Sequence, residues 1–356
     1  MSQSPYTPKN GLEALEWHEA VRKRPGMYLG QINTRGFVEM LKGIIRMMVR
    51  DCHATFVNLE FDKDLGAKIS YDNHSEFIEN NWGTINTRSH PFSIEYCVVN
   101  ALSERFTMTF RNDLNEVIQI QKYERGILTS GEQAERISCS SVEVDFSLDR
   151  GIWRNDFQWN LTFIIQHLQE LAFLYKGVTF SIEYEESNEA SRIVYHFEKG
   201  LENRMELEIL NGLGGCYFKN YIDKKIDGCQ FEIAYAFRNY DVDQPFIRSY
   251  VNDYYTPDGG THVDGILKGI TYGVMKYFQK HNLTEVYRIS EKGIKDHLVC
   301  FVNIRMHAPI FSGCVKNKLA NSEIIEPLAS YVSEQLFGRI ENDSESTEKL
   351  IRKFKI

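Results

Sequence analysis

The stretch EAVRKRPGMYLG, residues 19–30, and the stretch TPDGGTHVDG, residues 256–265, are the two passages that decide the fold of this chain. In the second passage two glycines precede a helix predicted at 262–280. His262 is therefore expected to serve in capping or loop docking rather than as a catalytic histidine. The first passage contains the short basic run Arg22-Lys23-Arg24. The residues between the two passages decide whether the fold also carries chemistry.

The composition is that of a globular protein with room for two domains. Of its 356 residues, 42% are apolar and 25% are charged, and these values argue against a disordered chain. The net charge of −8 gives no general attraction to a phosphate backbone, so contact with DNA would need a local basic patch. The candidates for such a patch are Lys219, Lys224, Lys225 and Arg238.

The cysteines and the hydropathy indicate a cytoplasmic protein without a metal centre. The seven cysteines form no CxxC pair and no His/Cys spacing typical of metal ligands, and such an odd, scattered set is typical of reduced thiols. The N-terminus, MSQSPYTPKN, has no apolar signal region, and no run reaches membrane-spanning length. We therefore expect a cytoplasmic location and no membrane partner.

Periodicity predicts a mixed helix and strand region up to about residue 200. Helices are expected at 34–51, with Thr34 as the N-cap, and at about 159–175. The polar stretch 185–192 is expected to be a loop. Alternating apolar residues predict strands near 57–61, 69–71, 142–146 and 178–185, and a hairpin over 106–123.

Periodicity predicts a second region of the same kind over residues 201–340. A helix at 262–280 separates the last two strands, and this order implies a crossover that returns the chain to the same sheet. A final helix is expected at about 322–340, and residues 341–356 are expected to be a flexible tail. The predicted strands lie near 206–210, 230–237, 246–251 and 298–306.

Several passages, taken in order, carry a resemblance to a known family. They are LEALEWHEAVRKRPGMYLG (12–30), VVNALS (98–103), KYERG (122–126), HLQELAFLYKGVTF (167–180), DGGTHVDG (258–265) and KNKL (316–319). Over nearly its whole length the chain resembles the ATPase half of type II topoisomerases, the family of gyrase B and its topoisomerase IV counterpart. The resemblance implies an α+β protein. An N-terminal GHKL (Bergerat-type) α/β sandwich at 1–200 would precede a transducer domain with a layered βαβ fold, similar to ribosomal protein S5, at 201–340.

The resemblance also implies a nucleotide chemistry that this chain has altered. The family uses a helical glutamate as general base and, four residues on, an asparagine that binds Mg²⁺. Aligning GFVEMLKGIIRMMVRD (36–51) on that helix puts Gly43 at the glutamate and Met47 at the asparagine. Glycine has no side chain to accept a proton, and a thioether is a poor ligand for a hard cation. We expect neither a catalytic residue nor a metal site here.

Two further motifs with which the family binds the nucleotide are also altered in this chain. Asn73, or Asp72 after a one-residue slip, stands at the position of the aspartate that binds adenine in the family. The segment RSHPFSIEYC (88–97) lacks the glycines with which the family's lid cradles phosphates. Because side chains and Pro91 occupy that turn, a triphosphate could not approach the backbone closely.

One candidate contact to a nucleotide lies in the second region. The family's transducer loop carries Gln-Thr-Lys, whose lysine reaches toward the γ-phosphate, and this chain has Cys314-Val315-Lys316. An ordinary exposed lysine near a helix start explains Lys316 equally well. Asn73 and Lys316 are therefore the two candidate cofactor-binding residues.

Three functions remain open from the sequence. We favour a catalytically inactive ATPase–transducer module without a cofactor, which acts by protein–protein interaction as a homodimer or as a partner or decoy of a type II topoisomerase. The second is an ATP-binding and hydrolysing component of a type II topoisomerase with a non-standard pocket, which would need ATP and Mg²⁺. The third is a DNA-binding, clamp-like protein.

Overall fold

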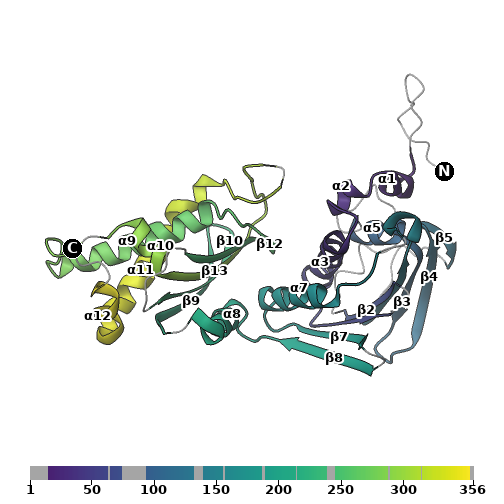
Figure 1. The fold of residues 1–356 in the computed structure, drawn as a ribbon, viewed down its shortest axis with the longest axis horizontal. Helices are drawn as coiled ribbons and strands as arrows, with labels where there is room; N and C mark the ends of the chain where they lie inside the picture. Colours follow the sequence, from purple (N-terminus) through teal and green to yellow (C-terminus); the bar gives the residue numbers. More distant parts are fainter. Residues whose placement is uncertain are drawn as a thin grey trace, which may run out of the picture. The chain divides into compact units, whose positions relative to one another are not determined.

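A computed structural model describes residues 15–62, 65–73, 94–131, 139–154, 157–186, 189–213, 215–238, 245–287, 289–313 and 315–352. The chain divides into two compact units, Met1–Phe197 and Glu198–Ile356 (Figure 1). This division lies close to the boundary at residue 200 predicted from the sequence. Each unit is described by itself below.

Unit 1 is built from one large sheet and a set of helices. Its helices are α1 (Trp17–Lys23), α2 (Gly26–Leu29), α3 (Thr34–Arg50), α5 (Ile94–Leu102), α6 (Arg150–Trp153) and α7 (Leu161–Leu174). Its strands are β1 (Phe56–Phe61), β2 (Gly66–Asp72), β3 (Ser103–Arg111), β4 (Val117–Glu124), β5 (Ile127–Ser130), β6 (Ser141–Leu148), β7 (Thr179–Glu186) and β8 (Glu189–His196).

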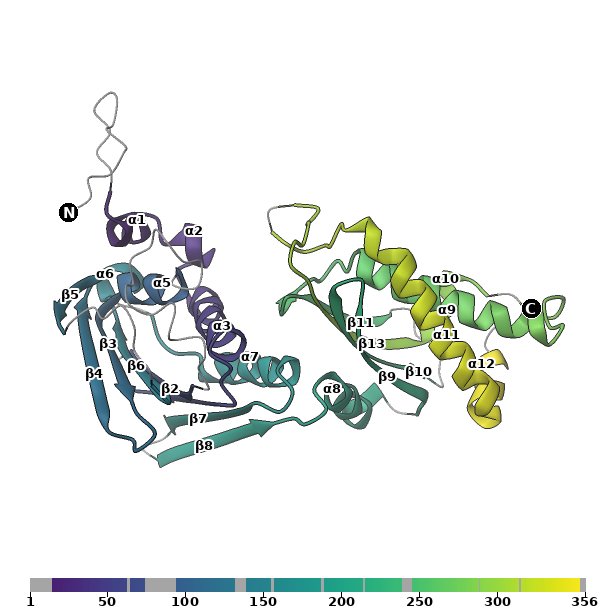
Figure 2. The same cartoon turned by 180° about the vertical axis from the view of Figure 1, so that it is seen from behind.

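The sheet of unit 1 buries one face under helices. Its strand order is β5-β4-β3-β6-β2-β1-β7-β8, and all neighbours are antiparallel except β1 and β7. Figures 1 and 2 show α3, α5 and α7 on the same side of this sheet. Along β6 the side chains alternate between buried and more exposed positions, as expected for a sheet with one covered face. The layer between helices and sheet is therefore where a buried site can form.

Helix α3 forms where the sequence predicted it, but its cap differs. The side chain of Asn33, not Thr34, accepts hydrogen bonds from the backbone N–H groups of Arg35 and Gly36, at 3.0 and 3.3 Å. Because asparagine satisfies two otherwise unpaired N–H groups, it fixes the first turn. The helix then presents an apolar stripe to the core, including fully buried Phe37 and Ile44.

Unit 2 contains a smaller sheet. Its helices are α8 (Leu201–Glu208), a π-helical turn (Ile209–Leu213), α9 (Thr261–Lys280), α10 (Glu291–His297), a 3-10 turn (Ser322–Ile324), α11 (Ile325–Asn342) and α12 (Ser344–Arg352). Its strands are β9 (Cys216–Ile226), β10 (Cys229–Arg238), β11 (Phe246–Val251), β12 (Tyr254–Tyr255) and β13 (Leu298–Arg305), in the order β12-β11-β13-β10-β9.

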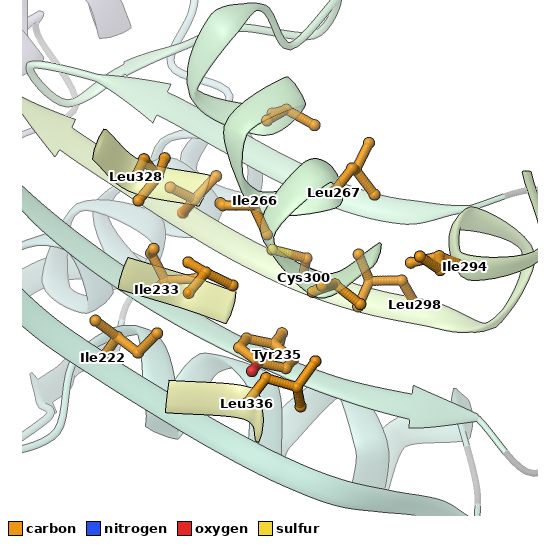
Figure 3. Close-up of a cluster of buried hydrophobic side chains, with 14 of the residues drawn as sticks. Ile222, Ile233, Tyr235, Ile266, Leu267, Ile294, Leu298, Cys300, Leu328 and Leu336 are labelled. Atoms are coloured by element: carbon orange, nitrogen blue, oxygen red, sulfur yellow. The ribbon is translucent and has the colours of Figure 1, made fainter. Parts of the chain in front are cut away.

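The predicted strand–helix–strand crossover of unit 2 is confirmed. Strands β11 and β13 pair in parallel, with Phe246 opposite Val299, and α9 lies between them in sequence. Figure 3 shows the core that this arrangement creates, in which Ile266 of α9 and Leu336 of α11 lie over Ile233 and Tyr235 of β10. All of these side chains are at most 1% exposed, so hydrophobic burial holds the helices on the sheet.

Two predictions on local structure in and before unit 2 were wrong. The strand expected at 206–210 is instead the end of α8 and the π-helical turn, because buried Leu201 and Met205 are spaced by four residues and anchor a helix. The loop expected at 185–192 carries the adjoining ends of β7 and β8, which pair antiparallel up to Glu186 and Glu189. The polar residues there form the end of a hairpin.

The expected flexible tail at 341–356 is also wrong for residues 344–352, which form α12. Its Leu350 is 1% exposed, and Thr347 donates its hydroxyl hydrogen bond to the carbonyl of Ile340 at 2.8 Å. Asp343 accepts a hydrogen bond from the N–H of Ser346 at 3.1 Å at the start of this helix. Buried Leu350 and Ile351 therefore fix a segment whose composition is mostly polar.

Within the described ranges, no helix is both long enough and apolar enough to cross a membrane.

Candidate functional site

The candidate site lies in unit 1, between α3, α5 and the β2 part of the sheet. Gly43, in the middle of α3, faces α5. A Cβ atom built on Gly43 would lie 3.3 Å from Cγ of Glu95, which belongs to the first turn of α5. This is a tight side-chain contact. The space beside position 43 is thus used by a carboxylate that comes from a different helix.

Glu95 was not singled out from the sequence. Its Oε2 is buried and has no hydrogen-bond partner among the described residues. Burial raises the pKa of this carboxyl, and nearby Asp51 raises it further, while the backbone N–H and Arg46 act in the opposite direction. No motif marks Glu95, because its position relative to Gly43 depends on how α5 packs against α3.

Met47, one turn after Gly43, is buried beside the thiol of Cys52. It is 3% exposed, and the Cys52 thiol donates to its Sδ at 3.6 Å. Burial raises the pKa of Cys52 to about 12, so this thiol is neutral at ordinary pH. No group of three or more His, Cys, Asp or Glu side chains in the described ranges is arranged to hold a metal. A neutral thiol and a thioether do not fit Mg²⁺, which prefers oxygen ligands.

Two tyrosines fill the layer between β2 and α5. The hydroxyls of Tyr71 on β2 and Tyr96 on α5 lie 3.0 Å apart, and each residue is 1% exposed. Tyr71 also lies 3.8 Å from the Cys52 thiol. Burial raises the pKa of both phenols, which keeps them neutral and able to share this hydrogen bond. The two tyrosines therefore join β2 to α5 through a buried hydrogen bond.

Asn73, directly after β2, is also used internally. It is 4% exposed, and its amide nitrogen donates to the Cys139 carbonyl at 2.9 Å. Its Oδ1 is buried and finds no partner in the described ranges, so Asn73 keeps one acceptor. Asp72, the alternative after a one-residue slip, accepts instead from the N–H groups of Thr55 and Phe56 at 2.8 and 2.7 Å. Asp72 therefore ties β2 to the start of β1.

The lid predicted to lack glycine lies mostly outside the described residues. Of RSHPFSIEYC, residues 94–97 form the start of α5, and residues 88–93, which include Pro91, are not described. The prediction that this turn disfavours a triphosphate therefore stays a prediction.

Lys316, the second candidate cofactor-binding residue, lies in unit 2. It is exposed, with a positive φ of 58°. Its Nζ lies 4.5 Å from the centroid of the Tyr254 ring, close enough for a cation–π interaction. Within its own unit, the lysine is thus held by an aromatic neighbour.

His262 and Arg238 are both buried, which changes their interpretation. His262 is 0% exposed and neither ring nitrogen has a partner in the described part of the chain, so it packs in the core instead of capping α9. Burial lowers its pKa to about 3. Arg238, proposed for a basic patch, is 3% exposed and its guanidinium carbon lies 5.9 Å from the Phe246 ring centroid. The patch therefore loses one of its four members.

The basic run of the first passage has a structural role. Arg22 donates to the carbonyl of Ala101 at 2.7 Å and to Asp149 Oδ2 at 2.6 Å, and Arg125 Nε lies 3.0 Å from the same oxygen. Although burial alone would raise the pKa of Asp149, these two arginines and the Gly151 N–H lower it. The Asp149 carboxylate thus ties α1 to the β4–β5 turn, and Arg22 ties α1 to the end of α5.

Comparisons with known proteins bear on the family and the fold of the chain. The sequence profile of the DNA gyrase B family matches residues 186–356. DNA gyrase B from Archaeoglobus fulgidus is 29% identical over 98% of this chain and 58% of its own length. DNA gyrase B from Clostridium acetobutylicum is 27% identical over 96% of this chain and 57% of its own length. The chain therefore spans less than two thirds of these relatives.

Solved structures show the same fold. The 43K ATPase domain of Thermus thermophilus gyrase B, in complex with an aminocoumarin, matches with a TM-score of 0.79 and 20% identity over 95% of this chain and 94% of that one. Gyrase B from Myxococcus xanthus matches with a TM-score of 0.77 and 17% identity, over 94% of this chain and 99% of that one. These likenesses confirm the predicted α+β fold.

Proposed function

We propose that this chain is a gyrase B-like, catalytically inactive ATPase–transducer module that acts by protein–protein interaction. The chain carries the frame of its relatives, but the side chains at the expected nucleotide site serve internal packing. A module of this kind would contribute a shape and a binding surface, without a reaction.

One observation supports this proposal: buried side chains of the protein lie in the layer where the alignment places the nucleotide. Met47, Tyr71 and Tyr96 are each at most 3% exposed and are linked through Cys52 and the Tyr71–Tyr96 hydrogen bond. Native interiors are closely packed, so a ligand could enter only after these side chains moved. Gly43 adds no group that could accept a proton.

The residues present do not fit the family's cofactors. Mg²⁺ needs oxygen ligands, whereas position 47 offers a buried thioether. A nucleotide base could still hydrogen-bond to Oδ1 of Asn73, which has no partner among the described residues, but the amide nitrogen of Asn73 already donates to the Cys139 carbonyl. We therefore propose that neither ATP nor Mg²⁺ is a resident cofactor.

Calorimetric titration with ATP and Mg²⁺ tests the inactive module directly. We expect no binding heat beyond dilution and no release of phosphate, with or without DNA. Micromolar binding accompanied by turnover contradicts the proposal. Titration with ADP in the same buffer is the control that separates weak adenine binding at Asn73 from binding of a triphosphate.

The proposed partners are a second copy of this chain or a type II topoisomerase subunit. Exposed apolar side chains on α2 support a contact in unit 1: Met27 is 73% exposed and Tyr28 is 45% exposed. Exposed apolar residues that lie together often mark protein contacts. The relatives are named as subunits of DNA gyrase, which supports a role in an assembly.

Light scattering coupled to gel filtration measures this partnership. If α2 mediates a homodimer, Met27→Glu shifts the mass toward that of a monomer. Leu210→Glu is the matched control, because Leu210 is 83% exposed but lies in unit 2, and it should leave the mass unchanged. If the wild-type protein is monomeric both alone and when mixed with gyrase B, both proposed partners are excluded.

A second candidate is an ATP-hydrolysing module with a non-standard pocket, and one observation favours it. Glu95 brings a carboxylate with an unpartnered, buried oxygen, among the described residues, to the side of Gly43. If wild-type protein releases phosphate, Glu95→Gln should abolish that activity, whereas Glu124→Gln, at an exposed position on β4, should not. Absence of activity in the wild type excludes this candidate.

A further inference from the structure

The sheet of unit 1 ends in a long edge strand, β8. Its eight residues pair with β7 without a register shift, and no described strand pairs with its other side. Figures 1 and 2 show β8 at this end of the sheet, beside β7. An edge strand presents a row of backbone N–H and C=O groups to which a further strand can be added.

The other three edges of the two described sheets carry features that discourage such addition. Strands β5 and β12 have four and two residues, which gives an added strand little to pair with. Strand β9 has lysines at positions 219, 224 and 225, and its pairing with β10 contains a register shift. Short edges, lysines and bulges are the usual means by which proteins keep a sheet edge unpaired.

Strand β8 has none of these protective features. Its sequence, EASRIVYH, contains no Lys, Pro or Gly, and none of its eight residues, all of which the structure describes, has a positive φ. Ile193, Val194 and Tyr195 are residue types that favour strands, and Val194 is 52% exposed. This edge is therefore suited to accept a further strand.

The side chains of β8 alternate between the two faces of the sheet. Ile193 lies opposite Ile182 of β7, which is 0% exposed, and therefore shares the face of that buried residue. Val194 and Arg192 lie on the other face. Arg192 stays 59% exposed, although its Nε lies 3.6 Å from the carboxylate of Glu183. A strand added at this edge would thus cover apolar side chains on both faces.

The charges of β8 select one register for pairing with a second copy of itself. In an antiparallel pair about a twofold axis, one residue lies opposite its own copy, because opposite residues share a face. With Arg192 at that position, two guanidinium groups oppose each other. With Val194 there, Arg192 opposes His196, which is positive when protonated. With Ile193 there, Arg192 lies opposite Val194, and no like charges are opposed.

We propose that β8 pairs antiparallel with β8 of a second copy of this chain, with Ile193 at the twofold axis. The two sheets of the dimer then become one continuous sheet. The partner is that of the proposed function, on which this pairing rests, but the surface differs from α2. ATP turnover by the wild type would contradict the inactive module and would leave this pairing untouched.

Substitutions at Val194 test the pairing by charge, because this residue lies opposite Arg192 of the second copy, twice in each dimer. Val194→Lys should weaken the dimer about tenfold, and Val194→Glu should strengthen it about threefold. Gel filtration coupled to light scattering, over a dilution series, measures the dissociation constant. Leu114→Lys and Leu114→Glu are the matched controls, at a 78% exposed position between β3 and β4, and should leave it unchanged. Thermal unfolding checks that each variant is folded.

Ile193→Cys tests the register itself. At the twofold axis the two Cβ atoms would lie about 5 Å apart, close enough for a disulfide after a small shift. Mild oxidation should therefore give a covalent dimer on a non-reducing gel. Ser191→Cys is the matched control, because its own copy would lie four residues along the partner strand, about 13 Å away, and it should give none. Wild-type protein oxidised in parallel shows what the native cysteines contribute.

Four results overturn this pairing. The first is a wild type that is monomeric over the whole dilution series. The second is an equal effect of Val194→Lys and Val194→Glu, and the third is absence of a covalent dimer with Ile193→Cys. The fourth is a dimer that Met27→Glu dissociates and the Val194 variants leave unchanged, which places the contact on α2 and leaves the proposed function standing.

Discussion

Two helix glycines, Gly269 in unit 2 and Gly43 in unit 1, differ in what surrounds them. In α9 of unit 2, a Cβ on Gly269 would lie 2.7 Å from the carbonyl oxygen of Ala329 and 2.7 Å from Cβ of Val332 in α11. In α3 of unit 1, a Cβ on Gly43 would meet only Cγ of Glu95, at 3.3 Å, among the described residues. The backbone of α11 cannot move aside for an added methyl group at position 269, but the side chain of Glu95 can change its conformation to accommodate one at position 43. The glycine of α9 is therefore required by the helix packing, whereas Gly43 is tied to a single side chain.

The largest difference in stability between the two units is expected at low pH, where His262 in unit 2 becomes protonated on unfolding. Burial lowers the pKa of His262 to about 3, so between that value and 6.5 the unfolded chain binds more protons than the folded one. Stability is therefore lost as the pH falls through 6.5 toward 3, by an amount on the order of several kcal/mol for so deeply buried a group. Urea unfolding at a series of pH values, followed by circular dichroism, measures this loss.

The variant His262→Leu serves as the comparison for this pH dependence. It removes the titrating group, so its stability should depend less on pH between 4 and 7 than that of the wild type. All four tryptophans lie in unit 1, at positions 17, 82, 153 and 159, so tryptophan fluorescence reports that unit separately. Parallel pH curves for wild type and variant contradict the assignment to His262.

The next effect should come from Gly269→Ala. The added methyl group would collide with the backbone and with Val332 of α11, and such overpacking destabilises by about 1–3 kcal/mol. Gly338→Ala in α11 is the matched control, because no described atom lies within 4 Å of its Cβ position, and a gain of up to about 1 kcal/mol is expected there. A shift in the unfolding transition seen by circular dichroism, without a shift in tryptophan fluorescence, assigns the loss to unit 2.

A smaller effect is expected for Gly43→Ala. The gain in helix propensity, about 1 kcal/mol, is opposed by the contact with Glu95, so the net change should be close to zero. In a Glu95→Ala background the contact is gone and the same substitution should stabilise by about 1 kcal/mol. A double-mutant cycle from urea unfolding yields this coupling, and a coupling of zero shows that Glu95 and position 43 do not interact.

The smallest effect should be the pH dependence of Glu95, with a sign opposite to that of His262. Burial raises the pKa of Glu95 above 4.5, so its neutral form contributes stability that is present below 4.5 and is lost as the pH rises through the folded-state pKa. Glu95→Gln mimics the neutral form and should raise the stability at pH 7 but not at pH 4. Tryptophan fluorescence follows this unit, and a variant less stable at pH 7 contradicts the prediction.

Long periodic elements were predictable from the sequence, and short or polar ones were not. Helix α3 and the β11–α9–β13 crossover follow from apolar spacing alone. Residues 206–210 alternate like a strand, but buried Leu201 and Met205 anchor the preceding residues as helix α8. Residues 344–352 looked mobile because their composition is polar, although Leu350 is buried in the core of unit 2.

The candidate site was only partly predictable. The sequence singled out Gly43, Met47 and Asn73, and the structure places them along the layer between the helices and the sheet. It could not indicate Glu95 or the Tyr71–Tyr96 pair, because those residues are 25 or more positions away from their partners in the chain.

The sequence by itself determined the family frame, the crossover of unit 2 and the absence of a proton-accepting side chain at position 43, since each depends on residue type and local spacing. Only the tertiary structure decided what occupies the altered site. A carboxylate from α5 lies beside Gly43, two tyrosines bridge sheet and helix, and Asn73 donates to Cys139. The reason is physical: contacts between distant segments depend on how helices settle on a sheet, and close packing then fixes which side chains fill the space.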